Sequence, residues 1–449
     1  MVGQETAYRA DIDGLRALAV VLVLAFHAGS PFMPGGFVGV DVFFVISGYL
    51  ITSIVYRDLK AGAFSFATFF ERRIRRLFPA LVPVCIFALA FAYRFYLPGD
   101  FSGVVDAVMA AATFSSNWLY AFTSGYFDAP AATKPLLHTW TLAVEWQFYI
   151  AFPILLVITA KIGRKFVLPV VVVLAVGSLA FAITGEAIGA LRETMYLNSF
   201  ARFYEILFGA VLALLPGQMP KILAVPARWI GVGLIIASAL FLTEATPFPS
   251  YFALAPVIGS ALVVWAGMAG RDPLLFILKS SPFTYVGRIS YSLYLWHWPI
   301  LVALFYFVVD PDPVTRTFAV AVSVGLAILS YQFVELPFRG RKLLPSRNMV
   351  FGGTAATIAV FAGAASLDRA TNGMPFRFSP ALAQAMQLAE FSSPLACRHA
   401  QISVAVSGCM FSSTNAPASD ADLVVWGDSL ATGPRDAYSA LARNGTRLC

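Results

Sequence analysis

Long apolar runs separated by short polar segments recur along most of this chain of 449 residues. A helix needs about 20 apolar residues to cross the hydrocarbon core of a bilayer. Eleven runs approach or reach that length, so the pattern predicts an all-α polytopic membrane protein with a core of about ten helices and one extra helix. The runs are 14–30, 37–56, 77–97, 137–160, 166–184, 199–216, 229–243, 251–269, 284–309, 317–336 and 349–367.

The basic residues between these runs predict the orientation, because Lys and Arg concentrate in cytoplasmic loops. If the N-terminus is cytoplasmic, the loops on the opposite side hold only three basic residues, and the loops on the cytoplasmic side hold many more. The opposite loops are 98–136, 185–198, 244–250 and 310–316. The apolar segment 101–122 would reverse every later loop if it crossed the membrane, so we expect a re-entrant or packed outer segment there.

The composition agrees with a membrane protein. Hydrophobic residues make up 59% of the chain and charged residues 12%, whereas a soluble domain is nearer half apolar and a quarter charged. The net charge of +7 comes from the basic loops, so we expect a lipid bilayer as partner and no nucleic acid. Four cysteines are too few for a disulfide scaffold.

The composition changes after residue 367. Residues 371–420 are polar and rich in Ser, Ala and Pro, as is typical of a linker, and by parity they lie outside the cytoplasm. Residues 421–449 contain a short apolar run that ends at Gly427, which predicts a buried strand followed by a tight turn. We therefore expect a second, separate folding unit to start near residue 421.

Arg16 and His27 lie inside the first predicted span. They are eleven residues apart, which places them within about 20° of one helix face and about 16 Å apart along the axis. Ionisable groups at that depth usually face a protein interior or a cavity. A guanidinium can bind phosphate, and an imidazole can remove a proton from a hydroxyl or carry an acyl group. The structural alternatives are a snorkelling arginine and a histidine hydrogen-bonded within the bundle.

Four arginines fall within five positions just before the third predicted span: Arg72, Arg73, Arg75 and Arg76. Planar guanidinium groups bind phosphate in bidentate fashion, so we interpret this run as a clamp for the phosphates of a donor molecule. The alternative is that these charges only set the orientation of the neighbouring helices.

Two polar residues mark the fourth predicted span. His138 and Glu145 are seven residues apart and share a helix face, with Glu145 about 10 Å deeper. A carboxylate within a span needs a partner, and Arg16 and His27 are the candidates. Pairing with His27 would fix the tautomer of that imidazole. Further supporting residues are expected at Asp41, Ser47, Tyr291 and His297.

The tail carries a possible nucleophile at Ser429, preceded by Asp428. A serine on a sharp turn after a strand is exposed for attack. The Gly-Asp-Ser sequence is a weak signal by itself, and no Asp-x-x-His sequence follows it.

Taken together and in this order, these motifs resemble the acyltransferase-3 family of bacterial membrane O-acyltransferases. The resemblance covers residues 8–340. It implies an acyl donor, typically acetyl-CoA, engaged from the cytoplasmic side, and a carbohydrate hydroxyl as acceptor on the periplasmic side. It places the essential arginine and histidine of the family on Arg16 and His27, and its arginine motif on Arg72, Arg73 and Arg76. It implies no metal ion.

The tail looks like the start of an SGNH-hydrolase-like domain, a periplasmic α/β unit that some members carry after an extra helix, here 349–367. Ser429 would match the nucleophile of that domain. The later glycine, asparagine and Asp-x-x-His blocks are missing, so we expect an incomplete domain.

These observations lead to one expected function and two alternatives. The expected function is an O-acetyltransferase of the bacterial inner membrane, acting on an envelope glycan or lipid-linked glycan such as lipopolysaccharide O-antigen, with His27 and Glu145 at the reaction centre. A transporter or exporter would use the same buried charges to move a solute without covalent acyl transfer. A membrane-anchored esterase would use the spans only as an anchor.

Overall fold

The computed structural model describes residues 8–123, 133–188, 192–217, 219–308 and 310–378. Within these residues the secondary structure is helical and no strand occurs. The chain divides into two compact units, Met1–Tyr96 with Gly103–Ser366, and Leu97–Ser102 with Leu367–Cys449. The first unit contains nearly all the helices, and the site lies within it.

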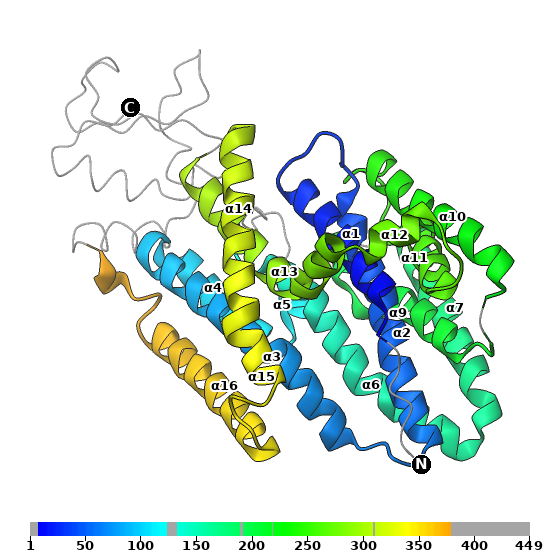
Figure 1. Cartoon of the computed structure of the whole chain (residues 1–449). Coiled ribbons are helices and arrows are strands. Elements are labelled where there is room, and N and C mark those ends of the chain that lie inside the picture. Colours follow the sequence, from blue (N-terminus) through cyan, green and yellow to red (C-terminus); the bar gives the residue numbers. More distant parts are fainter. Residues whose placement is uncertain (1–7, 124–132, 189–191, 218, 309, 379–449) are drawn as a thin grey trace, which may run out of the picture. The chain divides into compact units, whose positions relative to one another are not determined.

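Each of the eleven predicted runs coincides with a helix of the structure (Figure 1). The helices are α1 Ala10–His27, α2 Gly39–Lys60, α3 Phe66–Phe95, α4 Pro98–Ala112, α5 Ser116–Thr123, α6 Trp140–Ile162, α7 Val167–Ala187, α8 Arg192–Leu197, α9 Ser199–Leu214, α10 Lys221–Phe241, α11 Leu254–Ala266, α12 Pro273–Lys279, α13 Ser281–Phe307, α14 Pro313–Ser330, α15 Leu336–Arg339 and α16 Arg347–Ala370. Among the described residues, seven helices are long and apolar enough to cross a membrane. The predicted all-α polytopic membrane protein is confirmed, and the count of ten core helices stays a prediction.

Apolar side chains remain exposed along whole helix faces. On α6, Ile150, Ile154 and Ile158 follow one another at four-residue spacing, and each is more than two-fifths exposed. Valines of α7 such as Val173 are exposed as well. Contiguous apolar surface of this kind is unfavourable in water, and it fits helices that contact lipid.

The segment 101–122 is broken in the structure. α4 and α5 have 15 and 8 residues, and between them Phe114 adopts a left-handed backbone with φ of 53°. At about 1.5 Å per residue, neither helix reaches the roughly 30 Å of a bilayer core. Asn117 of α5 donates to Ser199 Oγ at 3.0 Å and accepts from Gln147 Nε2 at 2.8 Å. The segment is therefore packed against α6 and α9 instead of forming one continuous span.

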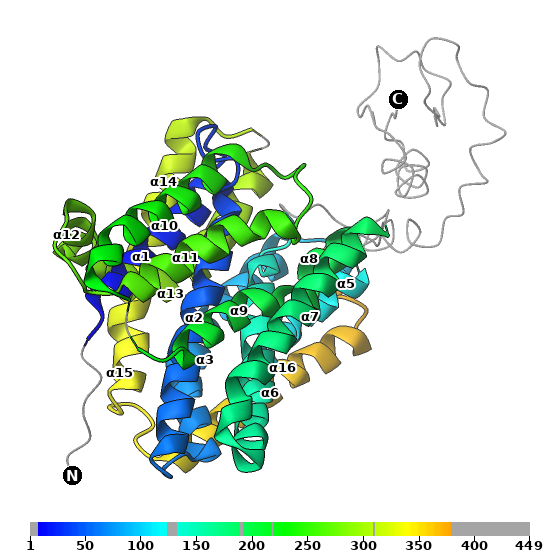
Figure 2. The same ribbon diagram turned by 90° about the vertical axis from the view of Figure 1, so that its right-hand side faces the viewer.

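Close helix contacts depend on a few glycines. A Cβ at Gly48 of α2 would lie 1.8 Å from the carbonyl oxygen of Ile206, and a Cβ at Gly209 of α9 would lie 2.0 Å from that of Val45. The two helices thus approach backbone to backbone, as small residues permit in membranes. Figure 2 shows α2, α9 and α7 side by side.

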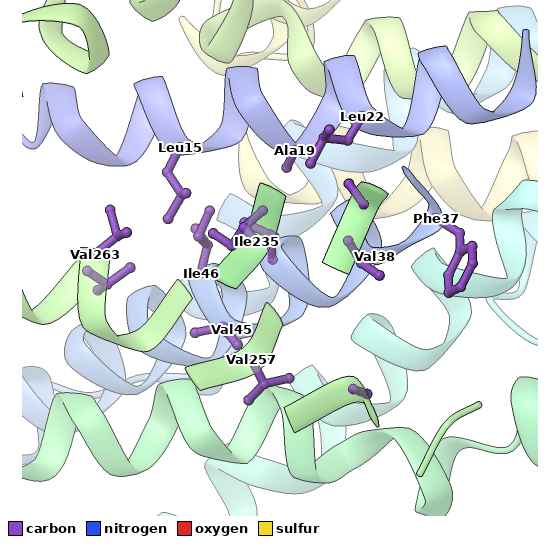
Figure 3. Packing of buried hydrophobic residues seen from close by; sticks show 14 of the residues in the cluster. Leu15, Ala19, Leu22, Phe37, Val38, Val45, Ile46, Ile235, Val257 and Val263 are labelled. Carbon is purple, nitrogen blue, oxygen red and sulfur yellow. The ribbon is translucent and has the colours of Figure 1, made fainter. Parts of the chain in front are cut away.

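One apolar core joins α1, α2, α10 and α11 (Figure 3). Leu15 and Leu22 of α1 pack with Val45 of α2, Ile235 of α10 and Val257 of α11. Val45 thus lies on the face of α2 that meets this core. The polar residue Ser47 lies on another face, where α2 borders a cavity.

The second unit is described only in part. The extra helix predicted at 349–367 corresponds to α16, whose residues 347–366 belong to the first unit. Within the second unit, the guanidinium of Arg377 lies 4.5 Å from the ring centre of Phe101. The predicted linker beyond residue 378, the predicted strand, Asp428 and Ser429 lie outside the described residues, so the SGNH-like segment stays a prediction.

Candidate functional site

A cavity opens among five helices of the first unit. It encloses about 760 Å³ of empty space, part of it continuous with the outside. Its lining comprises Arg16, Val40, Phe43, Phe44, Ile46, Ser47, Leu50, Ile51, Arg73, Arg76, Leu77, Thr141, Leu142, Glu145, Tyr149, Ser290, Tyr291 and Tyr294. Six of the residues predicted from sequence, Arg16, Ser47, Arg73, Arg76, Glu145 and Tyr291, therefore meet in one place.

Three guanidinium groups line this cavity. Arg73 and Arg76 are three residues apart on α3, so they share a helix face, and Leu77 on the same face also lines the cavity. Arg16 comes from α1 and forms an ion pair with Asp13 one turn earlier, with Nη1 and Oδ1 at 3.3 Å. In the described structure Arg73 and Arg76 form no such pair. The cavity thus holds a surplus of positive charge.

The other two arginines of the run have different places. Arg75 is 4% exposed, and its Nε donates to Glu71 Oε1 at 3.0 Å. Its Nη2 donates to the carbonyl oxygens of Pro345 and Ser346, so it fastens α3 to the segment before α16. Arg72 is exposed and does not line the cavity. Of the four predicted clamp residues, the structure therefore brings only Arg73 and Arg76 to the cavity, because an α-helix cannot turn all four to one face. That these two bind phosphate stays a prediction.

Glu145 and the hydroxyl groups of Ser47, Tyr149 and Tyr291 also line the cavity. The Tyr149 hydroxyl lies 2.6 Å from Ser47 Oγ and donates to Glu145 Oε2 at 3.3 Å. The Tyr291 hydroxyl donates to the carbonyl oxygen of Leu77 at 2.7 Å. Tyr149 was missed in the sequence, although its position four residues after Glu145 places the two side chains together on a helix.

Three histidines cluster beyond the cavity. His27 Nδ1 lies 3.0 Å from His297 Nε2, and His297 Nδ1 lies 2.7 Å from the carbonyl oxygen of Tyr294. His138 Nε2 lies 3.1 Å from the carbonyl oxygen of Leu295, and its ring centre is 5.6 Å from that of His297. Residues from α1, α13 and the turn before α6 thus form one polar group.

The predicted partner of His27 is corrected by this geometry. Glu145 lies in the cavity with Ser47 and Tyr149, and the nitrogen beside His27 belongs to His297. The His27 ring also packs against Phe26 and Trp298, with ring centres 5.1 and 4.7 Å away. Spacing within α6 could not reveal this pairing, because the partner is 270 residues away along the chain.

Tyr294 connects the cavity with the histidines. Its side chain lines the cavity, and its hydroxyl lies 2.9 Å from Thr141 Oγ1 and donates to the carbonyl oxygen of His138 at 3.0 Å. Its ring centre is 5.3 Å from that of His297. The cavity therefore ends one side chain away from the histidine cluster. Sequence reasoning selected Tyr291 and missed Tyr294, although the two share a face of α13.

Asp41 lies in a different polar group. It does not line the cavity, and its Oδ1 is 3.2 Å from Nη2 of Arg202. Nη1 of Arg202 is 3.0 Å from Glu205 Oε1, and all three side chains are 0% exposed. The guanidinium also lies within 5.1 to 5.6 Å of four ring centres, those of Phe44, Trp140, Tyr196 and Phe248. Asp41 is thus part of a closed ion cluster between α2 and α9.

The chain is similar to known proteins. A model of the acyltransferase-3 family, described as an acyltransferase domain, matches residues 9–332. The O-acetyltransferase OatA of Staphylococcus aureus strain MRSA252 is 31% identical over 372 residues, which are 78% of this chain and 61% of that protein. OatA of strain NCTC 8325 gives the same values. This chain spans about three fifths (61%) of the length of these curated relatives. No solved structure matches it.

Proposed function

Because this chain belongs to the acyltransferase-3 family, we propose that it is an integral membrane O-acetyltransferase. It moves an acetyl group from cytoplasmic acetyl-CoA to a hydroxyl of an envelope glycan, such as lipopolysaccharide O-antigen, on the periplasmic side of the bacterial inner membrane. One observation carries the proposal: a cavity with three arginines ends at Tyr294, whose ring contacts His297, the partner of His27.

The donor is assigned to the cavity by charge. Coenzyme A carries several phosphate charges, and guanidinium groups bind phosphate through paired hydrogen bonds. Arg16, Arg73 and Arg76 supply three such groups at one cavity. Glu145 is the one carboxylate in the lining, and it offsets part of the repulsion among them. With a cytoplasmic N-terminus, the arginines of α3 lie on the side where acetyl-CoA is available.

The chemical step uses His27 as general base. The acceptor hydroxyl oxygen forms a bond to the carbonyl carbon of the thioester while His27 takes the hydroxyl proton. The carbon–sulfur bond then breaks, and the imidazolium returns the proton to the leaving thiolate, which yields free coenzyme A. A positioned base of this kind accelerates a reaction by about 10²–10⁴-fold. Burial of the cluster beside the aromatic rings excludes water, which would otherwise hydrolyse the thioester.

The tail has a separate proposed role. If an SGNH-like domain follows α16, Ser429 accepts the acetyl group on its hydroxyl before passing it to the glycan. A Ser429→Ala variant that keeps glycan acetylation would remove Ser429 from the pathway. It would also exclude the esterase alternative.

The proposal is tested in cells by mass spectrometry of the envelope glycan. Cells that produce the wild-type protein are expected to carry O-acetyl groups, and cells that produce His27→Ala or Arg16→Ala at the same membrane level are expected to lack them. Ser323→Ala, on the buried side of α14 and far in sequence from the cavity residues, serves as the matched control. Full acetylation by the His27→Ala variant would overturn the assignment.

A further inference from the structure

A nitrogen of the His27 ring lies within hydrogen-bond distance of a nitrogen of the His297 ring. This contact indicates which nitrogen of each ring carries the proton. We infer that His297 is a positioning residue that holds His27 in the tautomer with the proton on Nδ1. Nε2 of His27 then keeps its lone pair and is the atom that accepts a proton. The inference rests on the proposed function for its chemical meaning, but the proton positions follow from the hydrogen bonds alone.

The first step concerns His297 itself. Its Nδ1 lies 2.7 Å from the carbonyl oxygen of Tyr294, three residues earlier on α13. A carbonyl oxygen only accepts hydrogen bonds, so Nδ1 of His297 carries the proton. A neutral imidazole has one N–H, and its other nitrogen, Nε2, is therefore an acceptor.

The second step is that His297 is neutral. Its side chain is 0% exposed, and an isolated charge at such a place is very unfavourable. In the part of the chain that the structure describes, no carboxylate forms an ion pair with His297. The titratable rings nearest to His297 are those of His27, Tyr294 and His138, and none of them in its neutral form supplies a counter-charge to a cation.

The third step transfers this result to His27. Its Nδ1 lies 3.0 Å from His297 Nε2. Because that nitrogen has no proton and presents its lone pair, Nδ1 of His27 must donate. The ring of His27 is held between Phe26 and Trp298, which restricts its rotation. When Nε2 takes a proton, the bond from Nδ1 to His297 becomes charge-assisted and stronger. His297 therefore both selects the reactive nitrogen and stabilises the imidazolium.

His138 provides an internal contrast. Its Nε2 lies 3.1 Å from the carbonyl oxygen of Leu295, so the proton sits on Nε2. Its Nδ1 is buried and has no hydrogen-bond partner among the described residues. The structure thus assigns opposite tautomers to neighbouring histidines, with Nδ1–H at His27 and His297 and Nε2–H at His138.

Nitrogen-15 NMR of the full chain in lipid nanodiscs tests these assignments. The sequence contains four histidines, so selective ¹⁵N-histidine labelling gives few signals, and single substitutions assign them. In the wild-type protein we expect the Nδ1–H tautomer at His27. An Nε2–H tautomer at His27 would overturn the inference, whatever the activity of the protein.

Two variants separate positioning from packing. In His297→Gln the amide oxygen can still accept the hydrogen bond from His27, and in His297→Phe a planar ring remains but no acceptor does. We expect His297→Gln to keep the Nδ1–H tautomer and most of kcat. We expect His297→Phe to lose that tautomer and to lower kcat at least about tenfold, with the KM for acetyl-CoA unchanged in both.

Equal losses of kcat in the two variants would overturn the role of His297. Thermal unfolding in detergent shows whether either variant fails to fold, and in that case the wild-type spectrum alone decides. Failure of the proposed function looks different: His27→Ala would stay active while the wild-type spectrum still shows Nδ1–H.

Discussion

The surroundings of Arg202 differ from those of Arg16, Arg73 and Arg76, and the difference bears on where a donor could bind. Around Arg202, carboxylates on both sides and four aromatic rings fill all the space, and every side chain of the triad is 0% exposed. Around Arg16, Arg73 and Arg76, a cavity that is open to the outside remains, and Glu145 is the one carboxylate in its described lining. Burial of charge alone therefore does not distinguish a binding site from a structural ion cluster. Unpaired positive charge beside empty space is what we expect of a donor site.

The largest effect is expected at the closed cluster. Arg202→Met leaves Asp41 and Glu205 buried without a counter-charge, and breaking a buried pair in this way costs about 3–5 kcal/mol. The variant should accumulate poorly in membranes and unfold at a lower temperature in detergent. Adding Asp41→Asn and Glu205→Gln to Arg202→Met removes both uncompensated charges, so this triple variant should recover much of the lost stability. If Arg202→Met unfolds like the wild-type protein, the cluster is not a stabilising element.

At the open cavity we expect a substitution to change stability little and to weaken binding of the donor strongly. Arg76→Ala removes a proposed phosphate contact, and a hydrogen bond to a charged group contributes about 1.5–3 kcal/mol. The KM for acetyl-CoA should rise by about 10- to 100-fold, while the unfolding temperature stays close to that of the wild type. Arg72→Ala removes the same charge from the exposed face of α3 and is the matched control. Equal KM values for the two variants would assign the effect to net charge.

Arg75 should behave like a structural residue although it belongs to the same run. Arg75→Ala removes the donors to Glu71, Pro345 and Ser346, and unpaired buried acceptors cost about 1–3 kcal/mol. Because Arg341 and Arg347 still pair with Glu71, the loss should be at the lower end. Thermal unfolding should shift down, and the KM for acetyl-CoA should stay unchanged. A raised KM for acetyl-CoA without a change in unfolding temperature would contradict this structural role and would indicate that Arg75 binds the donor.

The smallest effect is expected at the boundary between the cavity and the histidines. Tyr294→Phe keeps the ring that lies beside His297 and removes the hydroxyl that bonds with Thr141 and the carbonyl of His138. A single hydrogen bond contributes about 1 kcal/mol, so a modest drop in unfolding temperature is expected.

Tyr294→Ala opens the boundary, and faster release of free acetate from acetyl-CoA should follow. Unchanged hydrolysis in Tyr294→Ala would show that the ring does not seal the cavity.

The sequence predicted the helices well because apolar length and loop charge act locally. Each apolar run became a helix, and loop charge correctly argued against a continuous span at 101–122. The first apolar run also placed Arg16 and His27 in one helix, which the structure shows as α1. Helical spacing also places Arg75 on a different side of α3 from Arg73. The separate position of Arg75 could therefore have been predicted from the sequence.

The tertiary pairings were beyond the sequence. His27 meets His297, and Asp41 meets Arg202, only because α1 packs against α13 and α2 against α9. The glycines that allow these approaches, such as Gly287 beside the Asp13 carbonyl, do not reveal their partners in a single sequence. The choice of His297 over Glu145 as the neighbour of His27 therefore required the structure.

One binding measurement tests the central claim most directly. Isothermal titration of the full chain in nanodiscs compares acetyl-CoA with S-acetylpantetheine, which carries the same thioester but no phosphate. The wild-type protein should bind acetyl-CoA much more tightly than S-acetylpantetheine, and the Arg73→Ala/Arg76→Ala double variant should lose that preference. A wild-type protein that binds both compounds equally, or a double variant that keeps the preference, would contradict a donor site in this cavity.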